Sequence, residues 1–175
     1  MIAIQAVMKY GAPFRHRNTP PIPPWAATVI LTNNYLESPF GQPFAIFFGT
    51  LCSAVIGVGL TKLFLLAGAS GESHLWICGA LSVAIASIFM SHTHTLHPAA
   101  ASTALICSIN AEIRHLGWFY LADQVICGVI VISIACLFGN MYARYPLYWF
   151  LPPKLSAPKP ADNKNSLHQT KTRKS

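Results

Sequence analysis

Long apolar segments alternate with short polar breaks along most of this chain. Three of the segments have the length that a helix needs to cross the hydrocarbon core of a bilayer, which is about 20 residues. These three segments are 44–66, 75–91 and 116–139. A fourth apolar segment is shorter and follows a polar break at 92–97. The pattern therefore predicts an all-α, polytopic membrane helix bundle, with three long spanning helices and a short or discontinuous helix after His97-Pro98.

The short helix, at about 95–109, differs from the others in its length. About 15 helical residues extend only about 22 Å, whereas the hydrocarbon core is about 30 Å thick. Charge nevertheless favours a crossing, because a crossing places both basic ends of the chain on one side of the membrane. We therefore expect part of the 92–97 break to lie within the membrane, which is allowed where the backbone lines a cavity.

The transmembrane domain is expected to extend over 25–150, between two polar ends. Its first part, 25–36, is apolar but too short to cross, and we expect an interfacial or re-entrant piece. Residues 1–24 form a proline-rich basic lead-in without the apolar stretch of a cleavable signal peptide. Residues 151–175 are rich in lysine, proline and serine, and we expect a disordered basic tail.

The composition agrees with a multi-pass membrane protein. Of the 175 residues, 53% are hydrophobic and only 10% are charged, whereas about 25% of the residues of a soluble domain are charged. Basic ends on such a protein usually set its topology, so the net charge of +7 does not indicate a nucleic-acid partner. The five cysteines all lie in apolar segments without CxxC spacing, and we interpret them as small buried hydrophobes. We expect no cofactor.

The polar break and the helix after it carry the candidate chemistry. A helix that begins at Pro98 leaves the N–H groups of its first turn free, and the helix dipole adds positive potential there. Such an end is suited to an anion. The residues expected to bind a substrate are His97, Thr95, Ser102 and Thr103, together with Asp123 in the last span.

Each of these residues has a structural alternative. His97 could be an N-terminal cap whose ring bonds a neighbouring carbonyl, and the hydroxyls could bond backbone carbonyls one turn back. Asp123 could pair with Lys62 or Arg114, or relay protons beside the histidine. Two further histidines, His92 and His94, suggest a metal site. No cysteine lies near them, however, and we favour structural roles over a metal.

Several short stretches of the chain together resemble the HPP family of small integral membrane proteins. They are 37–39, 42–43, 53–58, 61–64, 95–98, 103–105 and 116–119. The ending 144–149 (Arg-Tyr-Pro-Leu-Tyr-Trp) looks most like the fungal branch of this family. The resemblance covers about residues 26–150. It implies a bundle of about four membrane helices, and it also implies transport, since plastid and cyanobacterial relatives are linked to nitrite uptake.

The chain departs from the family pattern at its central motif. The family's His-Pro-Pro-Ala-Gly-Ala-Thr is His-Pro-Ala-Ala-Ala-Ser-Thr at 97–103. An Arg-Asn pair expected after position 43 is Phe44-Ala45, and a Gly-His expected beyond it is Gly49-Thr50. We find no full spanning helix ahead of residue 25. The chain is therefore interpreted as an N-terminally shortened and diverged member.

Two functions from different classes remain open. The first is a transporter or channel for a small anion such as nitrite, working as a homo-oligomer in the lipid bilayer. The second is a non-transporting membrane scaffold or accessory subunit, whose small-residue faces serve packing. An enzyme is not expected, because no nucleophile–base pair or metal signature stands out in the sequence.

Overall fold

The computed structural model describes residues 2–11, 23–34, 38–142, 145–146 and 149, and the regular structure in these ranges is helical. The elements are α1 (Ile2–Tyr10), α2 (Pro24–Asn34), the short 3-10 helix η1 (Pro39–Gly41), α3 (Pro43–Leu65), α4 (Ala69–Ser73), α5 (Leu75–His92), α6 (Pro98–Ile109), α7 (Ala111–Leu116) and α8 (Phe119–Tyr142). The prediction of an all-α membrane helix bundle is confirmed. Part of the expected lead-in is described, and α1 forms within it. The expected tail at 151–175 lies outside the described residues.

Three of the described helices are long and apolar enough to cross a membrane. They are Pro43–Leu65, Leu75–His92 and Phe119–Met141. The last of them begins three residues later than expected, because Gly117 adopts a left-handed conformation (φ 54°) and ends α7. α6 has 12 residues and α2 has 11, so each extends less than about 20 Å. Both are half-length helices.

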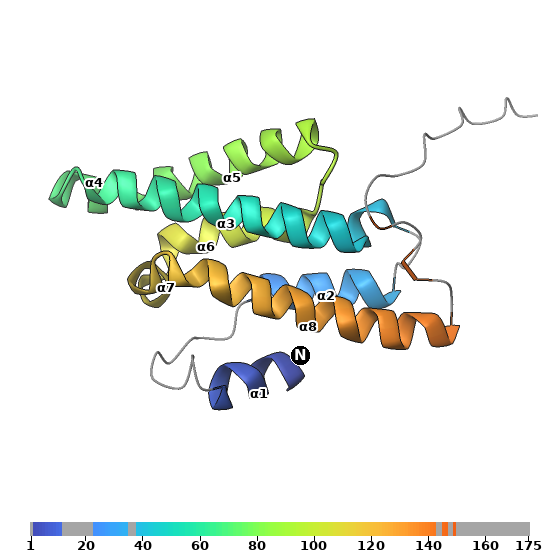
Figure 1. The fold of residues 1–175 in the computed structure, drawn as a ribbon. Helices are drawn as coiled ribbons and strands as arrows, with labels where there is room; N and C mark the ends of the chain where they lie inside the picture. The colour runs from blue at the N-terminus through green and yellow to red at the C-terminus, as the bar shows by residue number, and fades with distance from the viewer. Residues whose placement is uncertain (1, 12–22, 35–37, 143–144, 147–148, 150–175) are drawn as a thin grey trace, which may run out of the picture.

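The helices form one bundle with α3 at its centre (Figure 1). α3 packs against α5, α6 and α8, and α2 packs against α6 and α8. α4 and α7 lie at one end of the bundle, and the connection between α5 and α6 lies at the other end (Figure 1). α1 lies along α8 and contacts it. α6 therefore lies among its neighbours, whereas α2 packs on α6 and α8 and keeps an exposed side that includes Ile30.

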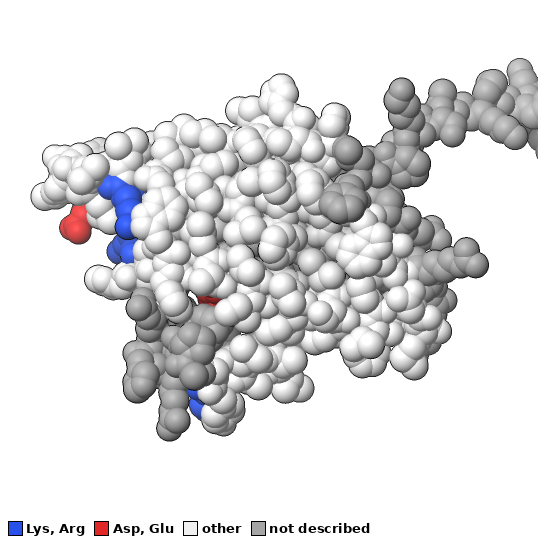
Figure 2. Space-filling view, in the orientation of Figure 1, with Lys and Arg blue, Asp and Glu red and all other residues white. Residues whose placement is uncertain are grey.

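The surface of the bundle is largely uncharged, as lipid contact requires. Figure 2 shows a broad white face, with most of its described charged atoms toward the end that carries α4 and α7. Large apolar side chains are exposed on the long helices, among them Trp76, Ile88 and Leu137. In water such a surface would favour aggregation, whereas in a bilayer it faces acyl chains.

The closest packing is between α3 and α6. Ser53, Gly57 and Thr61 recur every four residues on α3 and are all buried, as the small-xxx-small pattern requires. A Cβ atom added at Gly57 would lie 2.7 Å from the carbonyl oxygen and 2.8 Å from the Cα atom of Ala104. One turn further along α3, the Thr61 hydroxyl lies 3.0 Å from that of Ser108 in α6. The two backbones therefore approach as closely as glycine allows.

Gly57→Ala is expected to destabilise the bundle by about 1–3 kcal/mol, because its Cβ atom meets backbone that cannot rotate away. Gly59→Ala is the matched control, since a Cβ atom at Gly59 has no neighbour within 4 Å. The midpoint of thermal unfolding in detergent measures the difference. Equal midpoints for the two variants would contradict the close α3–α6 contact.

Candidate functional site

His97 lies immediately before α6 and is fully buried. Its Nε2 atom is 3.0 Å from Oγ1 of Thr28 in α2, and its Nδ1 atom is 2.8 Å from the carbonyl oxygen of Phe40 in η1. The residue occupies the N-cap position, yet its side chain makes no capping hydrogen bond. The ring therefore joins three elements and does not cap its own helix.

The two partners of the His97 ring determine where its hydrogen lies. A carbonyl oxygen can only accept, so Nδ1 carries a hydrogen and donates it to Phe40. In the neutral ring Nε2 then accepts a hydrogen bond from the Thr28 hydroxyl. The same hydroxyl lies 3.2 Å from the carbonyl oxygen of Pro24. Thr28 thus has one hydrogen and two acceptors within reach.

The other hydroxyls expected at this site are divided between the interior and the surface. Thr95 is buried, and its hydroxyl lies 2.7 Å from that of Thr93. Thr103 is buried and donates to a backbone carbonyl one turn back, at 3.5 Å. Ser102 is exposed on α6. The structure therefore leaves Ser102 apart from the buried residues, and it gives both threonines nearby partners.

A second set of polar side chains lies within α8, and we call Tyr120, Asp123 and Gln124 the α8 polar cluster. All three are almost fully buried. The tyrosine hydroxyl, both carboxyl oxygens and both amide atoms have no hydrogen-bond partner among the described residues. Spacings of three and four residues place Asp123 and Gln124 on the same side of the helix as Tyr120. Buried polar groups without partners are costly, above all in hydrocarbon.

Trp25 in α2 packs against the same helix. Its side chain is buried, and its Nε1 atom has no hydrogen-bond partner among the residues that the structure describes. A Cβ atom added at Gly128 in α8 would lie 3.4 Å from Cη2 of this indole ring. Trp25 and Tyr120 also belong to one buried core. α2 therefore packs on the side of α8 that carries the buried residues.

Asp123 does not pair with the basic residues considered as its partners. Arg114 donates from Nη1 to the carbonyl oxygen of Ser108, and Nζ of Lys62 lies 5.4 Å from the centroid of the Trp118 ring. Both carboxyl oxygens of Asp123 remain without a hydrogen bond to any described residue. Of the two alternatives for Asp123, the ion pair is therefore not seen among the described residues, and each cation has another contact near the end of the bundle.

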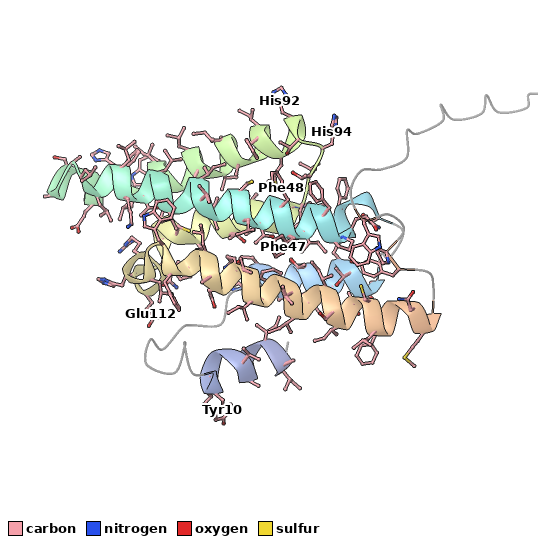
Figure 3. All side chains as sticks on the ribbon, in the orientation of Figure 1. Tyr10, Phe47, Phe48, His92, His94 and Glu112 are labelled. Atoms are coloured by element: carbon pink, nitrogen blue, oxygen red, sulfur yellow. The ribbon has the colours of Figure 1, made fainter. Side chains whose placement is uncertain are left out.

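His92 and His94 lie at the surface of the connection between α5 and α6, pointing away from the bundle (Figure 3). His94 adopts a left-handed conformation (φ 54°), so its backbone forms the turn that reverses the chain. No group of three or more histidine, cysteine, aspartate or glutamate side chains within the described ranges could hold a metal ion.

Two contacts of the His97 ring were not predicted from the sequence. Thr28 is 69 residues from His97, and the Phe40 carbonyl belongs to the backbone, so neither carries a local signal. Tyr120 and Trp25 resemble ordinary membrane aromatics in the sequence. Gln124, like Asp123, did carry a signal in the sequence, because a polar side chain inside an apolar span is costly unless it faces protein or water.

η1 receives a second side chain from a distant part of the chain. The hydroxyl of Tyr145 donates to the carbonyl oxygen of Gly41 at 2.7 Å, next to the carbonyl that His97 uses. Tyr145 follows α8 and is buried, and burial raises the pKa of its phenol. Because the phenol stays neutral at physiological pH, the hydroxyl keeps the hydrogen that it donates.

Comparison with known proteins gives one family and two relatives. The model of the HPP transmembrane region matches residues 1–146. Two transmembrane proteins of Dictyostelium discoideum are 30% and 31% identical to this chain over 129 residues, which are 72% of the chain and 44% and 40% of those proteins. The chain thus spans about two fifths of the length of these curated relatives. No solved structure matches it.

Thr28→Val is expected to destabilise the protein by about 0.5–2 kcal/mol, because valine keeps the volume of threonine and leaves Nε2 of His97 without its hydrogen bond. Thr28→Ser keeps the hydroxyl and serves as the control. Thermal unfolding of both variants in detergent gives the comparison. A Thr28→Val protein at least as stable as Thr28→Ser would show that this bond contributes nothing.

Proposed function

This chain belongs to the HPP family of transmembrane proteins, and we propose that it transports a small anion such as nitrite across the membrane in which it resides. The observation that carries the proposal is the α8 polar cluster. A protein that only packs helices together gains nothing from a tyrosine, an aspartate and a glutamine that are buried without partners. Polar groups inside a membrane domain are expected where a solute or a proton passes.

The donors near α8 suit an anion. An indole N–H can only donate, and tyrosine and glutamine side chains can donate as well. Trp25, Tyr120 and Gln124 together offer such donors from α2 and α8, and all of them lack partners among the described residues. Several donors that no protein acceptor has used are what a small oxyanion needs once it leaves water.

Asp123 adds a condition to this proposal. A charged carboxylate beside these donors would repel an anion, whereas a protonated carboxyl group would add one more donor. The anion therefore crosses together with a proton, and Asp123 carries that proton. The proposed transport is then driven by a proton gradient as well as by the anion gradient.

The half-length helices support the same proposal. In transporters, binding sites are typically built where helices are discontinuous. Here α2 ends at Asn34 and α6 begins at Pro98, and the bond between Thr28 and His97 joins the two. His97, immediately before α6, is fully buried, so the start of this helix need not face lipid. The route that we propose passes the buried residues His97, Thr95 and Thr103, and it leaves out Ser102, which is exposed.

A non-transporting scaffold is the second candidate, and one observation favours it. Both ring nitrogens of His97 have partners, and the side chain is fully buried. A histidine bound in this way serves to join helices without any solute. The scaffold differs from the transporter in one expectation, because it needs no polar atoms on α8.

Nitrite uptake into liposomes that carry the full chain is expected to exceed uptake into empty liposomes, and to rise when the outside is made acidic. Asp123→Asn should remove the acid stimulation, because an amide cannot exchange a proton. His97→Ala should reduce uptake to the level of empty liposomes. Ser102→Ala is the control for expression and insertion, and it should transport normally.

Two outcomes would contradict this proposal. Uptake at the level of empty liposomes, with the wild-type protein folded and inserted, would favour the scaffold. Unchanged uptake in both Asp123→Asn and His97→Ala would mean that the protein transports nitrite by a route that does not use these residues.

A further inference from the structure

Two basic side chains line one small cavity at the end of the bundle opposite His97. The cavity holds about 10 Å³, room for about one water molecule, and lies between α3, α6 and α7. Lys62 and Arg114 form part of its wall, together with Gly117. Most of the described charged atoms on the visible face of Figure 2 lie at this end of the bundle.

Neither positive charge is neutralised by an acidic group of the described chain. Arg114 is half-buried, and one of its five N–H donors is used, by the carbonyl oxygen of Ser108. The ammonium of Lys62 lies over the Trp118 ring and forms no ion pair with a described residue. Glu112, which Figure 3 labels at α7, is exposed and pairs with neither cation. Two cations with unused donors therefore share one wall.

Gly117 keeps the approach to Lys62 open. It adopts a left-handed conformation (φ 54°), and a Cβ atom there would lie 3.5 Å from Cε and 3.6 Å from Nζ of the lysine. The missing side chain leaves one flank of the ammonium uncovered. A ligand larger than a water molecule does not fit inside this cavity, so it would have to contact the two side chains at the opening, which we call the mouth.

Exposed apolar side chains adjoin the lining residues Lys62, Leu65 and Gly117 in the sequence. Leu63, Leu66 and Trp118 are each at least half exposed, at 60%, 84% and 51%. Tryptophan is typical of the level of lipid headgroups, where an apolar ring meets water. A ligand that reaches the two cations here therefore lies between a polar end and an acyl-chain environment.

We propose that Lys62 and Arg114 bind the phosphate of an anionic lipid headgroup. The guanidinium supplies paired N–H donors that match phosphate oxygens, and the ammonium supplies a point charge. The acyl chains of the lipid extend along the exposed apolar side chains near the mouth. Basic pockets between membrane helices bind phospholipid headgroups on these physical grounds. The site does not depend on the proposed transport of an anion.

The test is native mass spectrometry of the full chain in detergent, titrated with phosphatidylglycerol and, separately, with phosphatidylcholine of the same acyl chains. The wild type should retain phosphatidylglycerol at lower concentration than phosphatidylcholine. Each basic residue near an anionic lipid changes affinity about fivefold, so Lys62→Gln/Arg114→Gln should weaken phosphatidylglycerol binding roughly 20-fold. Lys9→Gln in α1 removes the same type of charge elsewhere, and it should bind as the wild type does.

Equal binding of the two lipids by the wild type would overturn the proposal. So would unchanged phosphatidylglycerol binding in the double variant, or a weakening in Lys9→Gln equal to that in the double variant. If the double variant does not fold, Lys62→Gln and Arg114→Gln singly are each expected to lose about fivefold, and no loss in either would overturn the site. Competition with inorganic phosphate distinguishes a site for a lipid headgroup from a site for free phosphate. Full displacement of the lipid by millimolar phosphate would show a site for the free anion and overturn the lipid assignment.

Discussion

Backbone groups within a bilayer must find hydrogen-bond partners inside the protein, and the 3-10 helix η1 between α2 and α3 meets this constraint with side chains from elsewhere in the chain. η1 turns the chain there, and two of its carbonyl oxygens point toward other elements. His97 donates to the oxygen of Phe40, and Tyr145 donates to the oxygen of Gly41. Two side chains from distant segments thus provide donors to the carbonyl oxygens of this turn. This arrangement joins η1 to the start of α6 and to the segment after α8.

The long helices could be predicted because their signal is local. A run of about 20 apolar residues has one stable form in lipid, so 44–66 and 75–91 agree closely with α3 and α5. The close contact of α3 has a local signal in Ser53, Gly57 and Thr61, because small residues at that spacing let two helices approach closely. The start of the last helix was misjudged, because the conformation of Gly117 depends on how α7 meets α8.

The partners in the candidate site could not be predicted, because they are set by tertiary packing. Nothing in the local sequence connects His97 with Thr28 or with the Phe40 carbonyl. The cost of burying Asp123 was visible from its place in an apolar span, but its lack of a partner was not. Ser102 was expected to bind a substrate because it lies within the motif at 97–103. The turn of the helix nevertheless places it on the exposed side of α6.

The short length of α2 also affects how the protein is made. A helix of 11 residues cannot cross the bilayer alone, and both helices that it packs against, α6 and α8, are synthesised after it. α2 therefore emerges from the ribosome well before its neighbours exist. α2 reaches its final position only when α8 has entered the membrane. The insertion machinery must therefore hold α2, or readmit it, until α8 arrives.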